Sequence, residues 1–299
     1  MPYRNIFVAN ETVLKLRNRQ LVADNGEEFT FPVEDIRCIV IDNEKSVLSA
    51  QLIAFLAAYN VCLLVCDRRH MPAAQLLPVG AYCRVQKRIQ LQIAQSKPKS
   101  KRLWQKIVVQ KIENQARCLE LAEKPGAEKL RAFAAGVQSG DPTNREGCAA
   151  RVYFPLLFGK AFTRDSELEI NAALNYGYAV LRAFLAKTLV AYGLEPALGL
   201  HHQNQLNAFN LADDLLEPFR PAVDLFTATE LSDLEDGFGT AQKARLVQLL
   251  NCAVTVNGER CSLAHAAELL VQSLIAAFET DKPNLRLPEI GEIAFFDYD

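Results

Sequence analysis

Short runs of hydrophobic residues alternate with polar turn residues through the first eighty positions of the chain. These runs are rich in β-branched and aromatic residues, which predicts strands at 6–8, 13–16, 20–22, 29–31 and 36–41. The sequence Asp24-Asn25-Gly26 is typical of a β-hairpin. A helical spacing of apolar positions after the cap candidate Ser49 predicts a helix over 49–59, followed by strands at 61–66 and 73–77.

After Pro78-Val79-Gly80 the apolar positions follow the helical period for most of the remaining chain. This pattern predicts helices near 84–95, 100–121, 127–138, 143–158, 167–191, 210–227, 240–252 and 262–278. Residues 280–299 show no sustained period and are predicted to be a tail that needs a partner or a groove. We therefore expect an α+β protein with a β-rich domain at 1–80, a larger all-helical domain at 81–279 and a tail at 280–299.

The composition is that of a folded protein. Half of the 299 residues are hydrophobic and 23% are charged, which is enough apolar surface for a large core. The eight cysteines include no Cys-x-x-Cys pair and most lie among apolar residues, so structural zinc is not expected and reduced thiols are. The N-terminus lacks the pattern of a signal peptide, and the most apolar stretch, 52–66, is too short to span a bilayer. A cytoplasmic protein without membrane contact is the expectation.

Charge is unevenly distributed, although the formal net charge is only −2. Between residues 84 and 117 there are ten basic residues and one acid, Glu113. Such a stretch either binds phosphates or forms the solvated face of a long helix, and the residues alone leave both open. The opposite imbalance lies between 210 and 236, where eight acids accompany Arg220. We expect Arg220 to pair with a phosphate or with Asp224, and favour the second.

The acids Asp213, Asp214 and Glu217 form a candidate metal site. On a helix the first two share a face with the third. A helix start capped by Asn210 accounts for the two aspartates through the helix dipole, but Glu217 lies too far along for that effect. A divalent cation relieves the repulsion between such carboxylates, and oxygen ligands select hard ions such as Mg²⁺ or Mn²⁺.

Two other segments supply residues that could complete the site. His201 and His202 lie in a loop-like run just upstream of the acids and offer an imidazole, although a loop histidine is more often a hydrogen-bonded residue than a ligand. Glu146 is a further carboxylate, but it also completes a capping box with Thr143 at the start of a predicted helix. The residues alone do not decide between these roles.

Three segments resemble the CRISPR-associated integrase of spacer acquisition, the conserved endonuclease of CRISPR adaptation. They are Glu146 followed by Ala150, Tyr153 and Phe154, the run Asn-Ala-Ala-Leu-Asn-Tyr-Gly-Tyr at 171–178, and residues 202–221. The run 209–221 is the most specific element. The likeness covers most of the chain, including a β domain followed by a larger helical domain, and it resembles the short forms of type II systems.

This resemblance implies a Mg²⁺ or Mn²⁺ site made of Glu146, His202 and Glu217, with Asp214 as a further acid beside it. His202 is preferred to His201 because its distance from Glu217 along the chain fits the family better. Many relatives have aspartate where this chain has Glu217. The implied reaction is transesterification, in which a 3′-hydroxyl of protospacer DNA attacks a phosphodiester of the CRISPR array. Hydrolysis of branched DNA is implied at the same site.

The resemblance also implies partners. It predicts homodimers joined through the β domain, and two such dimers bridged by a dimer of the small second adaptation protein, acting on double-stranded protospacer and repeat DNA. The tail at 280–299 is expected to contact that bridging protein or the DNA. The expected phosphate contacts are Arg84, Lys87 and Arg88, followed by Lys99, Lys101 and Arg102.

Two other classes of function stay open at this point. One is a metal-dependent, structure-specific DNA nuclease of repair that uses the same residues. The other is a DNA-binding scaffold without catalysis, in which Glu146 caps a helix and the acids serve only the helix dipole.

Overall fold

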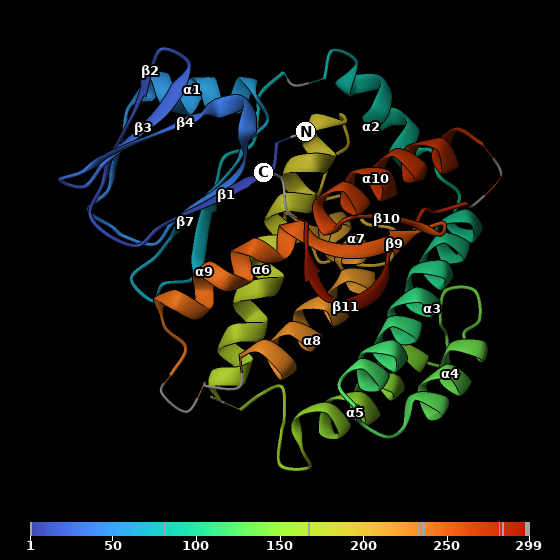
Figure 1. Ribbon diagram of the computed structural model, residues 1–299. Helices are drawn as coiled ribbons and strands as arrows, with labels where there is room; N and C mark the ends of the chain where they lie inside the picture. Colours follow the sequence, from blue (N-terminus) through green and yellow to red (C-terminus); the bar gives the residue numbers. More distant parts are fainter. Residues whose placement is uncertain are drawn as a thin grey trace. The chain divides into compact units, whose positions relative to one another are not determined.

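The computed structural model describes residues 2–80, 82–166, 168–231, 234, 237–280, 282 and 284–296. The described residues form two compact units, one ending at Cys83 and one beginning at Arg84 (Figure 1). Among the residues described, no helix combines the length and the hydrophobicity that crossing a bilayer requires. All eight cysteines are free thiols.

The N-terminal unit contains two four-stranded sheets. The first has the order β1 (Arg4–Val8), β5 (Ile36–Ile41), β7 (Cys62–Cys66) and β8 (Pro72–Gln75). Its first three strands are parallel and β8 is antiparallel to β7. The second has the order β4 (Glu28–Pro32), β3 (Gln20–Asp24), β2 (Val13–Arg17) and β6 (Val47–Leu48).

The hydrophobic pattern explains these elements. All six residues of β5 are buried, which matches its nearly continuous run of apolar side chains. The helix α1 (Ala50–Ala58) begins after Ser49, whose hydroxyl oxygen accepts a hydrogen bond from the backbone N–H of Leu52 at 3.2 Å. Leu52 and Leu56 pack into the core that both sheets share. The predicted strands, the helix and the hairpin at 24–26 are confirmed here.

The second unit is mostly helical. Its helices are α2 (Val85–Ile93), α3 (Lys97–Leu121), α4 (Ala127–Ala135), α5 (Arg145–Phe158), α6 (Glu169–Ala191), α7 (Asn210–Leu216), α8 (Arg220–Glu230), α9 (Thr240–Gln248) and α10 (Leu263–Glu279). The long helix α3 packs against α4, α5, α8 and the 3₁₀ turn Glu217–Phe219. The helix predicted over 210–227 is divided at this turn because Pro218 and Pro221 have no backbone N–H to continue the helical hydrogen bonds.

The second unit is not all helical as expected, because it carries a small antiparallel sheet. Its strands have the order β10 (Glu259–Ser262), β9 (Cys252–Val256) and β11 (Glu289–Phe295). Residues 257 and 258, an Asn-Gly pair with φ of 52° and 82°, form the turn between β9 and β10. Figure 1 shows this sheet in orange and red, beside α10.

The prediction that residues 280–299 form a tail outside the helical domain is wrong for 284–296. Strand β11 pairs with β9, and Leu285 and Ile290 are buried. The buried Asn114 of α3 donates hydrogen bonds to the carbonyl oxygens of Pro218 at 2.7 Å and Pro288 at 2.9 Å. This segment therefore belongs to the helical unit. The remaining tail positions 281, 283 and 297–299 lie outside the described residues.

Candidate active site

The loop between α6 and α7 carries both candidate histidines, and Asp214 of α7 holds it in place. The fully buried Asp214 carboxylate accepts hydrogen bonds from the backbone N–H groups of Leu200 at 2.6 Å, His201 at 3.0 Å and His202 at 3.2 Å. Its Oδ1 also lies 2.6 Å from Nδ1 of His202. This hydrogen bond raises the pKa of His202, against the effect of partial burial. Because Nδ1 faces Asp214, Nε2 is the ring nitrogen left for a ligand.

Trp104 of α3 packs against the same two histidines. The ring of His201 stacks flat on the buried indole, with centroids 4.3 Å apart and an interplanar angle of 2°. The ring of His202 meets the indole edge-on at 5.6 Å. Together, a carboxylate and an aromatic ring fix the orientation of His202.

Asn210 organises this loop instead of capping α7 as expected. Its amide donates hydrogen bonds to the carbonyl oxygens of Ala197, Asn204 and Asn207 at 2.9–3.1 Å, and its Oδ1 accepts one from the Asn204 N–H. The N-cap residue is Phe209, which makes no side-chain cap. A capping asparagine accepts a helix N–H through its side-chain oxygen, but Oδ1 of Asn210 accepts from Asn204 of the loop.

Glu146 and Glu217 converge on one cation, the ammonium of Lys111 in α3. Both carboxylates form ion pairs with its Nζ, and Arg220 donates from Nε to Glu217 at 2.9 Å. Lys111 and Glu217 are buried, whereas Glu146 is partly exposed. Burial acts to raise the pKa of Glu217, but Arg220 and Lys111 lower it to about 2. Burial acts to lower the pKa of Lys111, but the two glutamates raise it.

Glu146 does not cap α5, so the predicted capping box with Thr143 does not account for this residue. The N-cap is Asn144, whose Oδ1 accepts from the N–H of Gly147 at 3.1 Å. The carboxylate of Asp141 accepts from the N–H groups of Arg145 at 2.8 Å and Glu146 at 3.0 Å. Since these two side chains satisfy the helix start, the Glu146 carboxylate is directed to Lys111.

The acids of α7 and its following turn have three different sets of partners. Asp213 accepts from Nδ2 of Asn207 at 2.7 Å, Asp214 holds the histidine loop, and Glu217 meets Lys111. The expected shared face of the three carboxylates is therefore not formed. Within the described part of the chain, no three His, Cys, Asp or Glu side chains are grouped closely enough to hold a metal ion.

The chemistry of the carboxylate pair nevertheless fits a hard cation. Oε2 of Glu217 is buried, and its partner is the ammonium of Lys111. Carboxylate oxygens and imidazole nitrogens are ligand types that Mg²⁺ or Mn²⁺ accepts, and Glu146, Glu217 and His202 supply them.

Asp224 is a second buried acid, and Tyr178 contacts both Asp224 and Arg220. It accepts hydrogen bonds from the hydroxyls of Tyr153 at 3.0 Å and Tyr178, and burial raises its pKa to about 6. The guanidinium of Arg220 lies 4.5 Å from the centroid of the Tyr178 ring. Arg220 forms its ion pair with Glu217, so the expected pairing with Asp224 is wrong.

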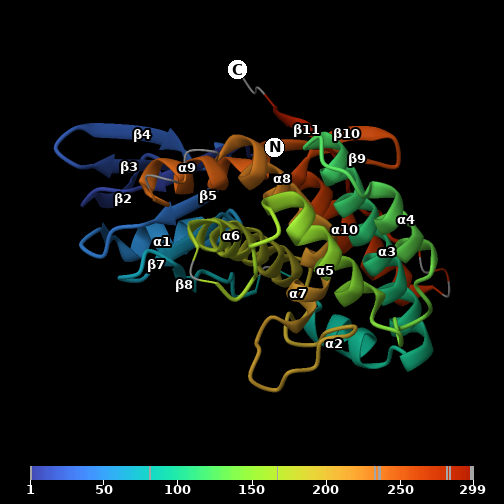
Figure 2. The same cartoon turned by 90° about the horizontal axis from the view of Figure 1, so that it is seen from below.

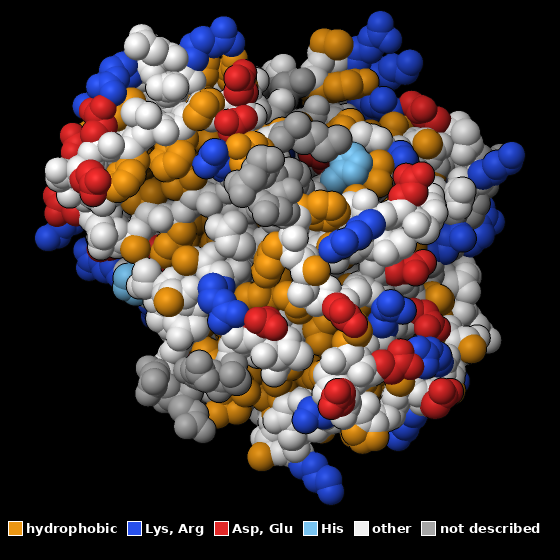
Figure 3. All heavy atoms as spheres, in the orientation of Figure 1, with side chains coloured by type: hydrophobic (Ala, Val, Ile, Leu, Met, Phe, Trp, Pro, Cys, Tyr) orange, Lys and Arg blue, Asp and Glu red, His pale blue; other side chains and the backbone are white. Residues whose placement is uncertain are grey.

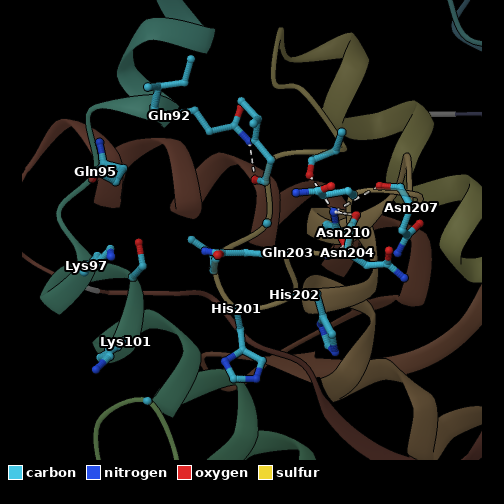
Figure 4. Close-up of a pocket in the computed structure, with 18 of the residues that line it drawn as sticks. Gln92, Gln95, Lys97, Lys101, His201, His202, Gln203, Asn204, Asn207 and Asn210 are labelled. Atoms are coloured by element: carbon cyan, nitrogen blue, oxygen red, sulfur yellow. Dashed lines mark hydrogen bonds between the residues drawn. The ribbon is translucent and has the colours of Figure 1, made fainter.

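A hollow of about 850 Å³ opens beside the two histidines. Figure 4 shows Lys97 and Lys101 on one side of it and the asparagines of the loop on the other. Gln92 connects α2 to the histidine loop at the wall of the hollow. Its Nε2 donates to the carbonyl oxygens of Glu195 at 2.9 Å and Leu198 at 2.8 Å. Figure 2 shows this loop extending beside α2.

Some of the predicted phosphate contacts are exposed, whereas others already have a partner within the protein. The exposed ones are Arg84, Lys87, Lys101 and Arg102 on α2 and α3 and their ends. Arg88 forms an ion pair with Glu279 at 2.6 Å. Lys99 is buried and donates to the carbonyl oxygen of Phe278 at 3.1 Å, so the expectation that it contacts DNA is wrong. Figure 3 shows lysine and arginine side chains gathered along the edge formed by α2 and the start of α3.

Comparisons with known proteins decide the family. A family model described as CRISPR associated protein Cas1 matches residues 6–235. The CRISPR-associated endonuclease Cas1 of Neisseria meningitidis serogroup C (strain 8013) is 42% identical over 308 residues, with all of both chains covered. This chain belongs to the Cas1 family. The predicted CRISPR-adaptation endonuclease and integrase is thereby confirmed at the level of the family.

Solved structures share the fold of this Cas1 chain. A casposase bound to an integration product has a TM-score of 0.77 at 19% identity, covering 99% of this chain and 96% of that one. A Cas6-RT-Cas1–Cas2 complex contains a chain with a TM-score of 0.70 at 16% identity, covering 96% of this chain and 36% of that one. The likenesses confirm the α+β class, with a β-sheet region followed by a mostly helical part.

Sequence reasoning missed two residues of this Cas1 site, Lys111 and Trp104. Both lie on the buried face of α3, two helical turns apart. Lys111 was missed because it lies in the basic stretch at 84–117, which was interpreted as one charged surface. The available signal was its place in the apolar stripe of the helix, next to Ile107, Val108 and Ile112, where a lysine needs a buried partner.

Proposed function

We propose that this Cas1 chain inserts protospacer DNA into a CRISPR array by attack of a 3′-hydroxyl on a phosphodiester. A Mg²⁺ or Mn²⁺ ion held by Glu146, Glu217 and His202 serves the reaction. The observation that carries this proposal is the meeting of two carboxylates, from α5 and from the turn after α7, at a single positive charge. His202 supports it, because Asp214 fixes its ring through Nδ1.

When bound, the metal ion neutralises charge on the target phosphate. The residues of the chain then position the reacting groups. Asp214 and Trp104 orient His202, and Arg220 keeps Glu217 ionised. In the reaction the 3′-oxygen bonds to phosphorus, the bridging oxygen of the array strand leaves, and one proton passes from the first oxygen to the second. The number of phosphodiester bonds is unchanged, so no nucleotide hydrolysis is required.

The DNA is proposed to lie along α2 and the start of α3. Arg84, Lys87, Lys101 and Arg102 are exposed there, and Lys101 also lines the hollow beside His201 and His202. Because they are exposed, these side chains can contact phosphates without leaving a buried partner. Such contacts position a duplex and carry little sequence preference.

The assembly proposed for this reaction contains more than one copy of the chain. Joining both ends of one DNA fragment needs two active sites at a fixed separation, and each chain offers one carboxylate pair of this kind among its described residues. We propose a homodimer formed through the N-terminal unit, and a bridging dimer of the small second adaptation protein. The solved Cas1–Cas2 complex and the casposase with its integration product support the partner classes.

The variant Glu146→Gln tests the proposed chemistry. It removes one carboxylate charge while the start of α5 keeps its caps from Asn144 and Asp141. With Mn²⁺, a short duplex with free 3′-hydroxyls and supercoiled plasmid, we expect joining to fall at least about 100-fold while folding and DNA binding persist. The matched control is Glu128→Gln on α4, whose side chain is 95% exposed.

The outcomes separate the three classes of function. Joining by the native protein and its loss in the Glu146 variant support the integrase. Cutting of branched DNA without joining supports a repair nuclease. Tight DNA binding by a native protein that neither cuts nor joins supports a scaffold, and wild-type levels of joining by Glu146→Gln contradict the proposed site.

A further inference from the structure

Lys111 holds an unusual place for a lysine. Its side chain comes from the middle of α3, is 8% exposed, and ends between carboxylates of two other elements. Removing the ammonium of Lys111 and the carboxylate of Glu217 from water is costly, and Glu146 beside them is only partly exposed. The arrangement persists because Glu146, Glu217 and Lys111 compensate one another, with Arg220 as a second cation on Glu217.

The same two carboxylates are proposed ligands of the divalent ion, so the ammonium and the metal compete for them. Both are compact cations that prefer oxygen partners. A carboxylate oxygen that contacts Lys111 Nζ cannot give the same lone pair to a metal ion. Glu217 pairs with Arg220 as well as with Lys111, whereas the ion pair of Glu146 is with Lys111.

We propose that Lys111 is a built-in counter-ion of the active site, which holds Glu146 and Glu217 together before metal binding and is displaced from them when Mg²⁺ or Mn²⁺ binds. This inference rests on the proposed function of the carboxylate pair. It makes metal binding an exchange of one cation for another. Lys111 therefore weakens the affinity for the metal while it keeps the two carboxylates from repelling each other in the metal-free protein. It is a positioning residue.

Direct binding of Mn²⁺ to the folded protein tests this exchange. Lys111→Met keeps the length and apolar character of the stem and removes the charge. We expect Lys111→Met to bind Mn²⁺ at least about tenfold more tightly than the native protein in isothermal titration calorimetry, without DNA. The matched control is Lys106→Met, an exposed position on the same helix, which should leave the affinity unchanged.

Thermal unfolding gives a second readout. Without metal, Lys111→Met should unfold at a lower temperature than the native protein because the buried Glu217 and the partly exposed Glu146 lose the cation between them. Mn²⁺ should raise its unfolding temperature by more than that of the native protein. In the double variant Lys111→Met with Glu146→Gln, the loss without metal should shrink, and so should the effect of Mn²⁺. Lys111→Gln, which can hydrogen-bond to both carboxylates, replaces the methionine variant if that one does not fold.

The results distinguish this inference from the function on which it rests. If the native protein binds Mn²⁺ and the Lys111 variants bind it equally or more weakly, the exchange is wrong and the metal site stands. If the native protein and the Lys111 variants are folded and none of them binds Mn²⁺, the metal site itself is wrong, and the exchange fails with it.

Discussion

Oδ1 of Asp214 lies 2.6 Å from Nδ1 of His202, and both oxygens of this buried carboxylate also accept backbone N–H groups of the loop that carries the histidine. One side chain thus fixes the backbone and the imidazole of the same segment. Metal-binding histidines commonly have such a partner on the second ring nitrogen. Asp214, which was expected as an acid beside the metal, is in this geometry the support of His202.

Asp214→Asn should impair both stability and joining. The amide replaces one acceptor oxygen with an NH₂ group that faces N–H donors, and a buried unsatisfied group costs about 1–3 kcal/mol. We expect a loss of that size in urea denaturation and a drop of at least about tenfold in strand joining, because His202 loses its support. Asp213→Asn is the control, since Asp213 is partly exposed and contacts Asn207 and Arg182. Native joining rates in Asp214→Asn would refute the supporting role.

The backbone of the histidine loop passes so close to Gly199 that no side chain fits there. A Cβ atom at this position would lie 2.3 Å from the carbonyl oxygen of His202 and 2.9 Å from Oδ2 of Asp214. Gly199→Ala should therefore push the loop away from Asp214, with a loss of about 1–3 kcal/mol in stability and of at least about tenfold in joining. Gly291→Ala is the control, because its Cβ meets open space. Equal behaviour of the two variants in both assays would contradict the assigned loop geometry.

Two lysines two positions apart on α3 should have separable effects on DNA binding. Lys101 is exposed at the hollow, whereas Lys99 is buried on the carbonyl oxygen of Phe278. Lys101→Ala should weaken DNA binding and reduce the slope of log affinity against log salt by about 0.9 for the lost phosphate contact. Lys99→Ala should lower the unfolding temperature and leave the salt slope unchanged. A salt slope that changes with Lys99 and not with Lys101 would reverse the assignment of the two residues.

Much of the fold could be predicted from the sequence, because the hydrophobic period of a segment and the residues of its turns are local properties of the chain. The apolar run at 36–41 and the cap at Ser49 gave β5 and α1 nearly to the residue. The strands β9 and β10 were missed although Asn257-Gly258 is a strong hairpin signal, since the flanking helical patterns were extended towards it. Strand β11 had no local signal, because it is held by pairing with β9 and by Asn114, a residue about 175 positions away in the chain.

The candidate site shows the same limit. The resemblance to the CRISPR integrase implied a metal site at 146, 202 and 217, but the partners of these residues could not be read from local spacing. Asp214 was assigned to the acids by its position on a helix, and the fold directs it to the loop. Lys111 became part of the site because α3 crosses both α5 and the turn after α7, a contact between segments that only the tertiary structure brings together.

Asp224 should make the native protein less stable as the pH rises through the acidic range. Burial raises its pKa from 3.8 to about 6, while hydrogen bonds from Tyr178 and Tyr153 oppose the shift. Between these two values the folded state binds a proton that the unfolded state has released. The contribution of Asp224 to stability is therefore fully present below about pH 3.8 and is lost as the pH rises to about 6. A shift of this size corresponds to about 3 kcal/mol.

The variant Asp224→Asn isolates this contribution, because its side chain does not titrate. The free energy of unfolding of the native protein minus that of Asp224→Asn should decrease by about 2–3 kcal/mol between pH 4 and pH 6 and stay constant above pH 7. Urea denaturation at a series of pH values measures it, with the exposed Asp165→Asn as the control. A difference that grows as the pH rises would mean that the tyrosine hydroxyls and Arg220 stabilise the carboxylate more than burial disfavours it.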